Sequence, residues 1–173
     1  MMRKNAMISV IMPVRNGDPA LLNLAIGSIR RQTYQNFEIV LADDGSTEAF
    51  AAILDQIAAS DGRIRLFHLP ERGVSETRNY AIRQAKGEII TFLDADDEFS
   101  PVCFEEAALL LEDEKINALW GGTVYFRNRE ALPPEEGVRA LSAEELKGCS
   151  LMMSPERLHR IRAECIGEPF QWR

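Results

Sequence analysis

Four short apolar runs divide the first hundred residues of the chain: 8–14, 37–42, 64–69 and 88–93. They are rich in β-branched residues and too short for typical helices, which predicts buried strands. Between them, apolar residues recur at helical spacing, and Leu21, Leu22, Ala25 and Ile29 form one such face. Because strand and helix alternate, the sequence predicts an α/β fold with a mainly parallel central sheet and helices on both faces.

Glycine and proline mark the ends of these segments. Gly87, in the stretch AKGE before the fourth run, suits the left-handed position that closes a helix. After Pro101 the pattern loosens into a helix at about 102–112, an apolar run at 118–126 and a polar, proline-bearing loop at 127–139. Three shorter segments follow, predicted as a helix at 142–146, a strand at 149–154 and a helix at 155–162.

The composition is typical of a soluble globular domain. The 173 residues are 46% hydrophobic and 27% charged, so we expect one domain over 1–173 rather than a disordered chain. A net charge of −7 disfavours binding along nucleic acid, because phosphate backbones require a basic surface. An acidic protein can still bind a nucleotide through a few placed groups.

The cysteine spacing and the apolar runs bear on location. Three cysteines stand far apart without a C-x-x-C pair, which favours reduced thiols in a cytoplasmic protein. The first apolar run is short and halted by Pro13, so we do not interpret it as a signal peptide. No stretch reaches the ~18 apolar residues of a transmembrane helix. We therefore expect a cytoplasmic location and no transmembrane segment in this chain.

Polar residues follow the first two predicted strands, at the sheet edge where α/β proteins bind ligands. The first strand ends in MPVRNGDP, where Pro13 lacks a backbone donor and Arg15 is a candidate ligand contact; the alternative is a plain turn. The second ends in VLADDGST, with Gly45 allowing a tight turn. Of Asp43 and Asp44, either one caps a helix while the other faces solvent, or one accepts hydrogen bonds from the ring N–H of a base or from ribose hydroxyls.

The third strand is followed by PERGVSETRN, in which Gly73 can open a turn. Arg72 and Arg78 lie in this stretch. Each is either a solvated helix residue or a clamp on phosphate, for which the guanidinium group is suited.

The fourth strand ends in EIITFLDADDEFSP, which packs three carboxylates into four positions. In an extended segment Asp94 and Asp96 share one face, and carboxylate oxygens suit Mg²⁺ or Mn²⁺. The alternative is a helix cap by Asp97 or Ser100, with Pro101 at the first helical position. That alternative leaves Asp94 and Asp96 unexplained.

Three stretches together carry a family resemblance: ISVIMPVRN, FEIVLADDGST and GVSETRNYAIRQAKGEIITFLDADD. In this order and at these separations they resemble the nucleotide-diphospho-sugar-binding half of a family 2 glycosyltransferase with the GT-A fold. The resemblance covers roughly residues 8–101 and leaves 102–173 as the start of an acceptor half. It implies a donor site for a nucleoside-diphosphate sugar, most often a UDP-sugar.

The resemblance assigns a base pocket to the first two strand ends. The backbone around Pro13 would line this pocket, and many family members have an aromatic residue at the position of Arg15. Asp44 would contact the uracil ring, with Asp43 nearby.

The resemblance assigns the phosphates to the other two strand ends. Arg78 would lie near the diphosphate and Asp94 near the ribose. Asp96, with Asp94 beside it, would bind the Mn²⁺ or Mg²⁺ ion that bridges the two phosphates.

The resemblance also implies an inverting transfer of the sugar to an acceptor hydroxyl. A metal ion and an arginine would neutralise the leaving diphosphate, while a base takes the hydroxyl proton. In the family this base is an acid downstream of the D-x-D strand. We therefore expect a C-terminally truncated chain whose base lies beyond Arg173, with Glu168 as the second choice.

The implied acceptor is a glycan or a lipid-linked molecule in polysaccharide or cell-envelope synthesis, with the parent protein associated peripherally with the inner face of the membrane. Two alternatives remain open. A nucleotidyltransferase would prefer a glycine- and lysine-rich phosphate loop after the first strand, and PVRNGDP is not one. A non-catalytic nucleotide-sugar-binding module would lack the downstream acid.

Overall fold

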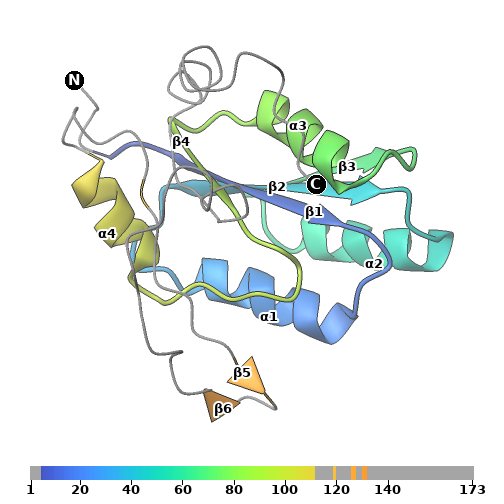
Figure 1. The fold of residues 1–173 in the computed structure, drawn as a ribbon, viewed down its shortest axis with the longest axis horizontal. Coiled ribbons are helices and arrows are strands. Elements are labelled where there is room, and N and C mark those ends of the chain that lie inside the picture. Colours follow the sequence, from blue (N-terminus) through green and yellow to red (C-terminus); the bar gives the residue numbers. More distant parts are fainter. Residues whose placement is uncertain (1–4, 112–118, 120–125, 128–129, 132–173) are drawn as a thin grey trace, which may run out of the picture.

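The computed structural model describes residues 5–111, 119, 126–127 and 130–131 (Figure 1). The predicted alternation of strand and helix is confirmed over the first hundred residues. The elements are β1 Ile8–Val14, α1 Pro19–Arg30, β2 Phe37–Asp44, α2 Glu48–Ala59, β3 Ile64–Leu69, α3 Val74–Gln84, β4 Ile89–Phe92, α4 Cys103–Leu110, β5 Phe126–Arg127 and β6 Glu130–Ala131. Those predicted at 142–146, 149–154 and 155–162 lie outside the described residues.

In the described part of the chain, the main sheet has four parallel strands in the order β3-β2-β1-β4 (Figure 1). Ile8 of β1 is the ladder partner of Phe37 on one side and of Ile89 on the other. The chain moves outward from β1 to β3 and then returns to the opposite side of β1. This reversal puts a topological switch point between β1 and β4, and ligands of open α/β sheets bind there, beyond the carboxyl ends of the strands.

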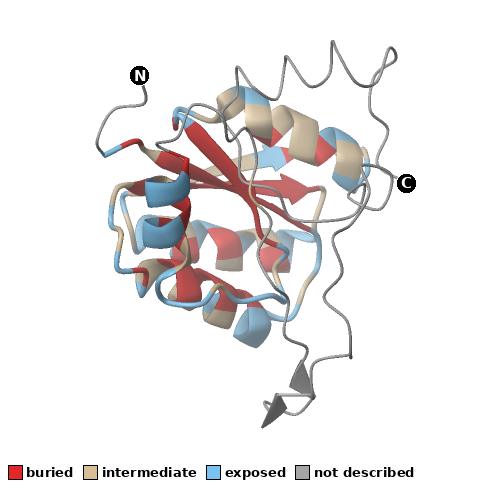
Figure 2. Cartoon of the chain, turned by 60° about the vertical axis from the view of Figure 1, so that its left-hand side comes forward, coloured by how far each residue is buried: buried red, intermediate tan, exposed pale blue. Residues whose placement is uncertain are grey.

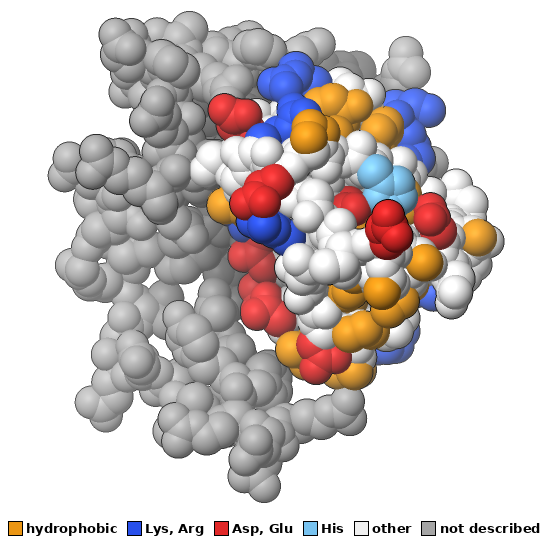
Figure 3. Space-filling view, turned by 90° about the vertical axis from the view of Figure 1, so that its right-hand side faces the viewer, with side chains coloured by type: hydrophobic (Ala, Val, Ile, Leu, Met, Phe, Trp, Pro, Cys, Tyr) orange, Lys and Arg blue, Asp and Glu red, His pale blue; other side chains and the backbone are white. Residues whose placement is uncertain are grey.

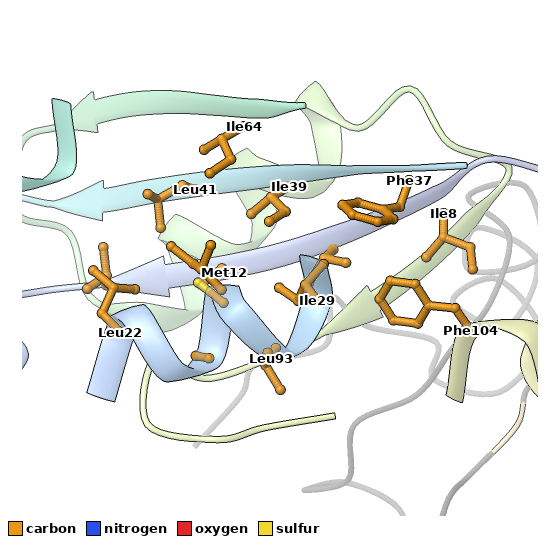
Figure 4. Close-up of a cluster of buried hydrophobic side chains, with 14 of the residues drawn as sticks. Ile8, Met12, Leu22, Ile29, Phe37, Ile39, Leu41, Ile64, Leu93 and Phe104 are labelled. Carbon is orange, nitrogen blue, oxygen red and sulfur yellow. The ribbon is translucent and has the colours of Figure 1, made fainter. Parts of the chain in front are cut away.

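Helices cover both faces of this sheet, as the sequence predicted. On one face the sheet packs against α1, α2 and α4 through a cluster that includes Met12, Leu22 and Phe104 (Figure 4). The strands β1, β2 and β4 are buried along their whole length, whereas the edge strand β3 is partly exposed (Figure 2). On the other face it packs against α3 through a smaller cluster that includes Ala81 and Ile90. Leu21, which the helical spacing placed on the apolar face of α1, is 42% exposed.

The start of α4 is capped from a distant part of the chain. Its N-cap residue, Val102, makes no side-chain cap bond. The buried side chain of Gln32 replaces it: Gln32 Oε1 accepts from the Phe104 amide at 3.0 Å, and Nε2 donates to the Ser100 carbonyl at 2.6 Å. The alternative of a helix cap by Asp97 or Ser100 is therefore wrong, because Gln32, which follows the end of α1, satisfies the free backbone amide instead.

Gly87 is required by close packing rather than by a left-handed backbone. Among the described glycines, only Gly45 and Gly73 have positive φ, so the expected left-handed cap at Gly87 is wrong. Its amide donates to Ser9 Oγ at 2.8 Å. A Cβ atom at position 87 would lie 2.6 Å from the Met7 carbonyl oxygen and 2.7 Å from the Ser9 amide nitrogen. The turn before β4 therefore lies directly against β1.

A buried carboxylate joins three strands near the amino end of the sheet. Glu38 of β2 accepts from Ser9 Oγ at 2.7 Å, from the Lys86 amide at 2.6 Å and from Arg65 Nη1 at 2.9 Å. Burial by itself raises the pKa of Glu38, but the hydrogen bonds from Ser9, Lys86 and Arg65 outweigh it, so the pKa is lowered overall. Glu38 is thus ionised and fully paired in the folded protein.

Within the described ranges, no helix combines the length and the apolar composition needed to cross a bilayer.

The packing of Gly87 predicts that Gly87→Ala strongly destabilises the fold. The new methyl group would push the backbone of β1 away from the turn, at a cost of about 1–3 kcal/mol. Gly62→Ala is the matched control, because nothing lies within 4 Å of its Cβ position and its φ is not positive. Urea unfolding of both variants measures the difference. Equal stability of the two variants would contradict this packing.

The paired state of Glu38 predicts a pH-dependent loss of stability in Glu38→Gln. A lowered folded-state pKa contributes stability above the unfolded pKa of about 4.5, and this contribution is lost as the pH falls through the folded pKa. At pH ~7 the variant should be less stable by about 2 kcal/mol, and the gap should narrow below pH ~4.5. Glu88→Gln, at an exposed position, is the control. A gap that stays constant as the pH falls through this range would contradict the assignment.

Candidate functional site

The predicted site residues lie at the carboxyl ends of β1, β2, β3 and β4 and in the segments that follow. Figure 3 looks onto this edge, where acidic side chains, arginine or lysine side chains and a histidine lie close together. The predicted set consists of Pro13, Arg15, Asp43, Asp44, Arg78, Asp94 and Asp96. Glu168 lies outside the described residues.

Asp44 is buried and joins β2 to the start of α3. Its Oδ1 atom accepts from the Arg72 amide at 2.8 Å and from Thr77 Oγ1 at 2.8 Å, and Thr77 is itself fully buried. Within the described part of the chain, both of these bonds use Oδ1, and Oδ2 accepts none. Asp44 therefore neither caps a helix nor faces solvent. Its carboxylate is held in a fixed orientation at the sheet edge.

Asp43 is also buried, and it is held by a histidine. Asp43 Oδ1 accepts from the Ser46 amide at 2.9 Å, and Oδ2 lies 2.8 Å from His68 Nδ1. The other ring nitrogen of His68 lies 3.3 Å from Asp55 Oδ1 on α2. The hydrogen bond between the His68 ring and Asp43 raises the pKa of His68 most strongly. Burial opposes this rise, and the hydrogen bond between the ring and Asp55 adds to it.

Sequence reasoning assigned no role to His68, since no metal-ligand spacing surrounds it. The structure makes it the direct ladder partner of Asp43. The signal would have been the correct alignment of β2 with β3. Because β2 is buried on both faces, its hydrophobic pattern does not alternate and does not fix that alignment to one residue.

The loops after β1 and β2 are bonded to each other. The Asn16 amide donates to Ser46 Oγ at 3.0 Å, and the Thr47 amide donates to Asn16 Oδ1 at 2.9 Å. Asn16 has φ 45° and Gly45 has φ 73°, both in the region that asparagine and glycine tolerate best. A Cβ atom at Gly45 would lie 2.7 Å from the Glu71 amide nitrogen. The loops after β1, β2 and β3 therefore form one connected rim.

Arg15 and Pro13 complete the β1 side of this rim. Arg15 forms an ion pair with Glu71 in the loop after β3, and both side chains are largely exposed. Pro13 is paired in register with Ala42 of β2. The Ile11 carbonyl faces β4, where it accepts from the Leu93 amide. The backbone N–H that Pro13 lacks would point to the same side, beyond the last residue of β4. Its absence therefore costs the sheet no ladder hydrogen bond.

Arg78 forms an ion pair with Asp94 across the switch point. The guanidinium Nη2 bonds Asp94 Oδ1, and the side chains are 17% and 51% exposed. Arg78 directly follows Thr77, which holds Asp44. The first turns of α3 thus bind a carboxylate from the end of β2 and one from the end of β4.

The D-x-D pair lies in a turn rather than in an extended segment. β4 ends at Phe92, and the Asp97 amide donates to the Asp94 carbonyl at 3.2 Å. The prediction that strand alternation aligns Asp94 and Asp96 is therefore wrong. Partial desolvation, and then the charges of Asp96 and Asp94, raise the pKa of Asp97, so the three carboxylates lie close enough to repel one another.

Asp96 is exposed and has no hydrogen-bond or ion-pair partner among the described residues. Over the same residues, no three His, Cys, Asp or Glu side chains gather as a ready-made metal site. Mg²⁺ and Mn²⁺ ions commonly take one or two carboxylates together with substrate phosphates. The carboxylate oxygens of Asp94 and Asp96 therefore fit an ion that is also bound by the phosphates of a substrate.

Comparison with known proteins gives a consistent result. The model of "Glycosyl transferase family 2" matches residues 9–150. An uncharacterized glycosyltransferase of Haemophilus influenzae is 45% identical over 92 residues, covering 53% of this chain and 36% of that protein. The uncharacterized glycosyltransferase EpsJ of Bacillus subtilis is 31% identical over 145 residues, covering 81% and 41%. The chain therefore spans well under half the length of these relatives.

Solved structures show the same fold. S. aureus TarS 1–349, in complex with UDP-GlcNAc, is 26% identical with a TM-score of 0.59, covering 66% of this chain and 33% of that chain. The mannosyltransferase PcManGT from Pyrobaculum calidifontis, in complex with GDP-Man and Mn²⁺, has a TM-score of 0.66 at 22% identity, covering 89% and 46%. The predicted GT-A fold is confirmed by these neighbours.

The contact between Asp44 and Thr77 predicts that Thr77→Val destabilises the protein. Valine keeps the shape but removes one of the two donors to a buried carboxylate, at a cost of about 1–3 kcal/mol. Thr91→Val is the matched control: Thr91 is also buried, and its Oγ1 has no hydrogen-bond partner among the described residues. We expect that variant to be neutral or slightly stabilised. Thermal unfolding compares the two, and an equal effect of both would contradict the role of Thr77.

Proposed function

This chain belongs to glycosyl transferase family 2, and from this premise we propose that the carboxyl edge of its sheet binds the nucleoside diphosphate part of a sugar donor. One observation carries the proposal: the adjacent residues Thr77 and Arg78 hold Asp44 and Asp94. They bring a buried hydrogen-bond acceptor and a cation to the switch point of the sheet. A nucleoside diphosphate offers a base that donates hydrogen bonds and phosphates that carry negative charge, so the two chemistries match.

The base would lie over the ends of β1 and β2. Asp44 has an oxygen that accepts no hydrogen bond among the described residues, and it would receive the ring N–H of a uracil. Asp43 would fix the adjoining turn, and the backbone around Pro13 would line the pocket. Arg15 takes the position of an aromatic residue in many family members, and its flat guanidinium group can stack on a base. Uridine is favoured because TarS, at 26% identity, was solved with UDP-GlcNAc.

The diphosphate would lie between α3 and the turn after β4. Some of the Arg78 N–H groups would donate to a phosphate oxygen instead of to Asp94. A guanidinium group forms strong paired hydrogen bonds with phosphate. Asp96, with Asp94 beside it, would hold Mn²⁺ or Mg²⁺, which supplies positive charge to the two phosphates. The repulsion among the three carboxylates favours this cation.

We propose that the donor sugar passes to an acceptor hydroxyl with inversion at the anomeric carbon. Arg78 stabilises the negative charge that develops on the leaving diphosphate. A general base takes the proton of the attacking hydroxyl, and in this proposal it lies in the acceptor half of the protein. The acceptor class that the family resemblance favours is a glycan or a lipid-linked molecule of cell-envelope or polysaccharide synthesis, handled on the cytoplasmic side.

Donor binding predicts a metal-dependent rise in the melting temperature. Thermal melts are run with UDP, GDP, dTDP and CDP, each with and without Mn²⁺. A nucleotide at ~100 times its dissociation constant adds about 2.7 kcal/mol, which raises the melting temperature by roughly 5–10 °C in a domain of this size. We expect this shift with UDP and Mn²⁺ together, and a much smaller one with either alone.

The same melts test the metal ligands. Asp96→Asn should remove the metal-dependent part of the shift, because it takes away a charged oxygen ligand. Glu98→Gln is the control: it removes a charge two positions away, from an exposed residue that pairs with Arg31, and should leave the shift unchanged. No shift with any nucleotide, or a shift that survives Asp96→Asn, would contradict the proposed donor site.

A further inference from the structure

His68 is a partly exposed residue that contacts a buried carboxylate at the carboxyl edge of the sheet. It is the next-to-last residue of β3 and the ladder partner of Asp43. The His68 side chain is 43% exposed, whereas that of Asp43 is 3% exposed. Their contact at 2.8 Å is the only one described between Asp43 and a side chain that can carry a positive charge. Protonation of an accessible ring can therefore act on a carboxylate that solvent scarcely reaches.

Asp43 also binds the turn after β2, so it links this turn to His68. While Oδ2 faces His68, Oδ1 accepts from the Ser46 amide at 2.9 Å. Ser46 in turn accepts from the Asn16 amide in the loop after β1. His68 therefore lies at the outer end of a chain of hydrogen bonds that runs through both loops of the proposed base pocket. A change in the orientation of Asp43 would move this turn, which immediately follows Asp44.

The ring of His68 is flanked by two carboxylates. Among the described residues, the charged groups that face it are Asp43 from β2 and Asp55 from α2, and Asp55 is 67% exposed. A neutral imidazole has one N–H, so it can donate to only one of them, while the other faces a lone pair. The protonated ring donates to both. This geometry favours the imidazolium, in agreement with the raised pKa of His68.

We propose that His68 is a positioning residue of the donor site: it orients Asp43, and through it the base-binding turn, most firmly when its ring is protonated. This inference rests on the proposed function. His68 does not touch the donor. Its effect on donor binding passes through Asp43, and its positive charge offsets one negative charge of an acidic edge that must accept a diphosphate.

The proposal gives donor binding a pH dependence of known sign. Below the pKa of His68 the ring is charged and both carboxylates are paired, so donor affinity is highest. As the pH rises through that pKa, the ring loses its charge and affinity falls. UDP-GlcNAc is the suitable probe, because the terminal phosphate of UDP itself titrates near pH 6, whereas both phosphates of a sugar diphosphate are esterified.

The experiment measures UDP-GlcNAc affinity in the presence of Mn²⁺ by calorimetry, from about pH 5 to about pH 8. His68→Asn places an amide nitrogen close to the position of Nδ1, so it keeps a donor to Asp43 but cannot be charged. His68→Ala removes both the donor and the charge. Glu88→Gln alters one charge at the amino edge of the sheet and is the matched control. Thermal melts of the ligand-free variants confirm that each one folds.

The wild type should lose about fivefold in affinity across this range, and Glu88→Gln should follow it. His68→Asn should bind with intermediate affinity and lack that part of the pH profile. His68→Ala should bind about tenfold more weakly than the wild type at low pH. The pH profile of His68→Asn is subtracted from that of the wild type. The difference reports the titration of His68 alone, because other groups, including Asp97, titrate in both proteins.

Two outcomes overturn the proposal in distinguishable ways. If the folded His68→Ala variant binds UDP-GlcNAc as the wild type does, with the same pH profile, His68 has no positioning role although the donor site stands. If the wild type binds neither UDP-GlcNAc nor any nucleotide of the melting series at any pH, the proposed function fails, and the donor role of His68 fails with it.

Discussion

The proposed site depends on one contact region: the first turns of α3, where Thr77 and Arg78 each hold a carboxylate from a different strand end. Asp44 arrives from β2 and Asp94 from beyond β4, and between them lies β1. Without α3 these acids would belong to separate loops. Gly73, with φ 89°, lets the chain turn directly into the helix, and Ala81 anchors the helix against the sheet. The packing of one helix thus sets the spacing between the proposed base and diphosphate subsites.

Hydrogen bonding separates the acids of this edge into two kinds. Asp43, Asp44 and Asp94 each have a described partner on a neighbouring element, and the first two are buried. Asp96 is exposed and has no such partner among the described residues. Carboxylates with fixed partners are oriented in advance and can recognise a ligand with little loss of entropy. A carboxylate without a partner is free to bind a cation, and this is the reason for assigning Asp96 to the proposed metal site.

Much of the fold could be predicted because it follows from local patterns. Apolar runs identified the strands, and the alternation with helices identified the parallel sheet with covered faces. The turn at Gly45 was also predictable, because a tight turn there needs a residue that tolerates positive φ. The site was predictable as a set of residues, since the carboxyl ends of parallel strands meet at one edge. The structure places these residues at that edge, and the roles proposed for them follow from this placement.

The features that sequence reasoning missed all depend on contacts between distant segments. Gln32 caps a helix that begins some seventy positions later in the chain, and no local pattern marks a glutamine for that role. Gly87 is required by the backbone of β1 rather than by its own φ. His68 meets Asp43 only through the register of two strands. Each needs the alignment of elements to within one residue, and a hydrophobic pattern does not supply it.

The central claim is that one edge of the sheet holds the nucleotide and the metal together. Paramagnetic broadening of backbone amide signals by Mn²⁺ tests it most directly, because the effect falls steeply with distance from the ion. With UDP present, the account predicts broadening centred on residues 94–97 and on the start of α3 near Arg78, and little broadening there from the same Mn²⁺ without nucleotide. Broadening centred elsewhere, or equal with and without UDP, would contradict it.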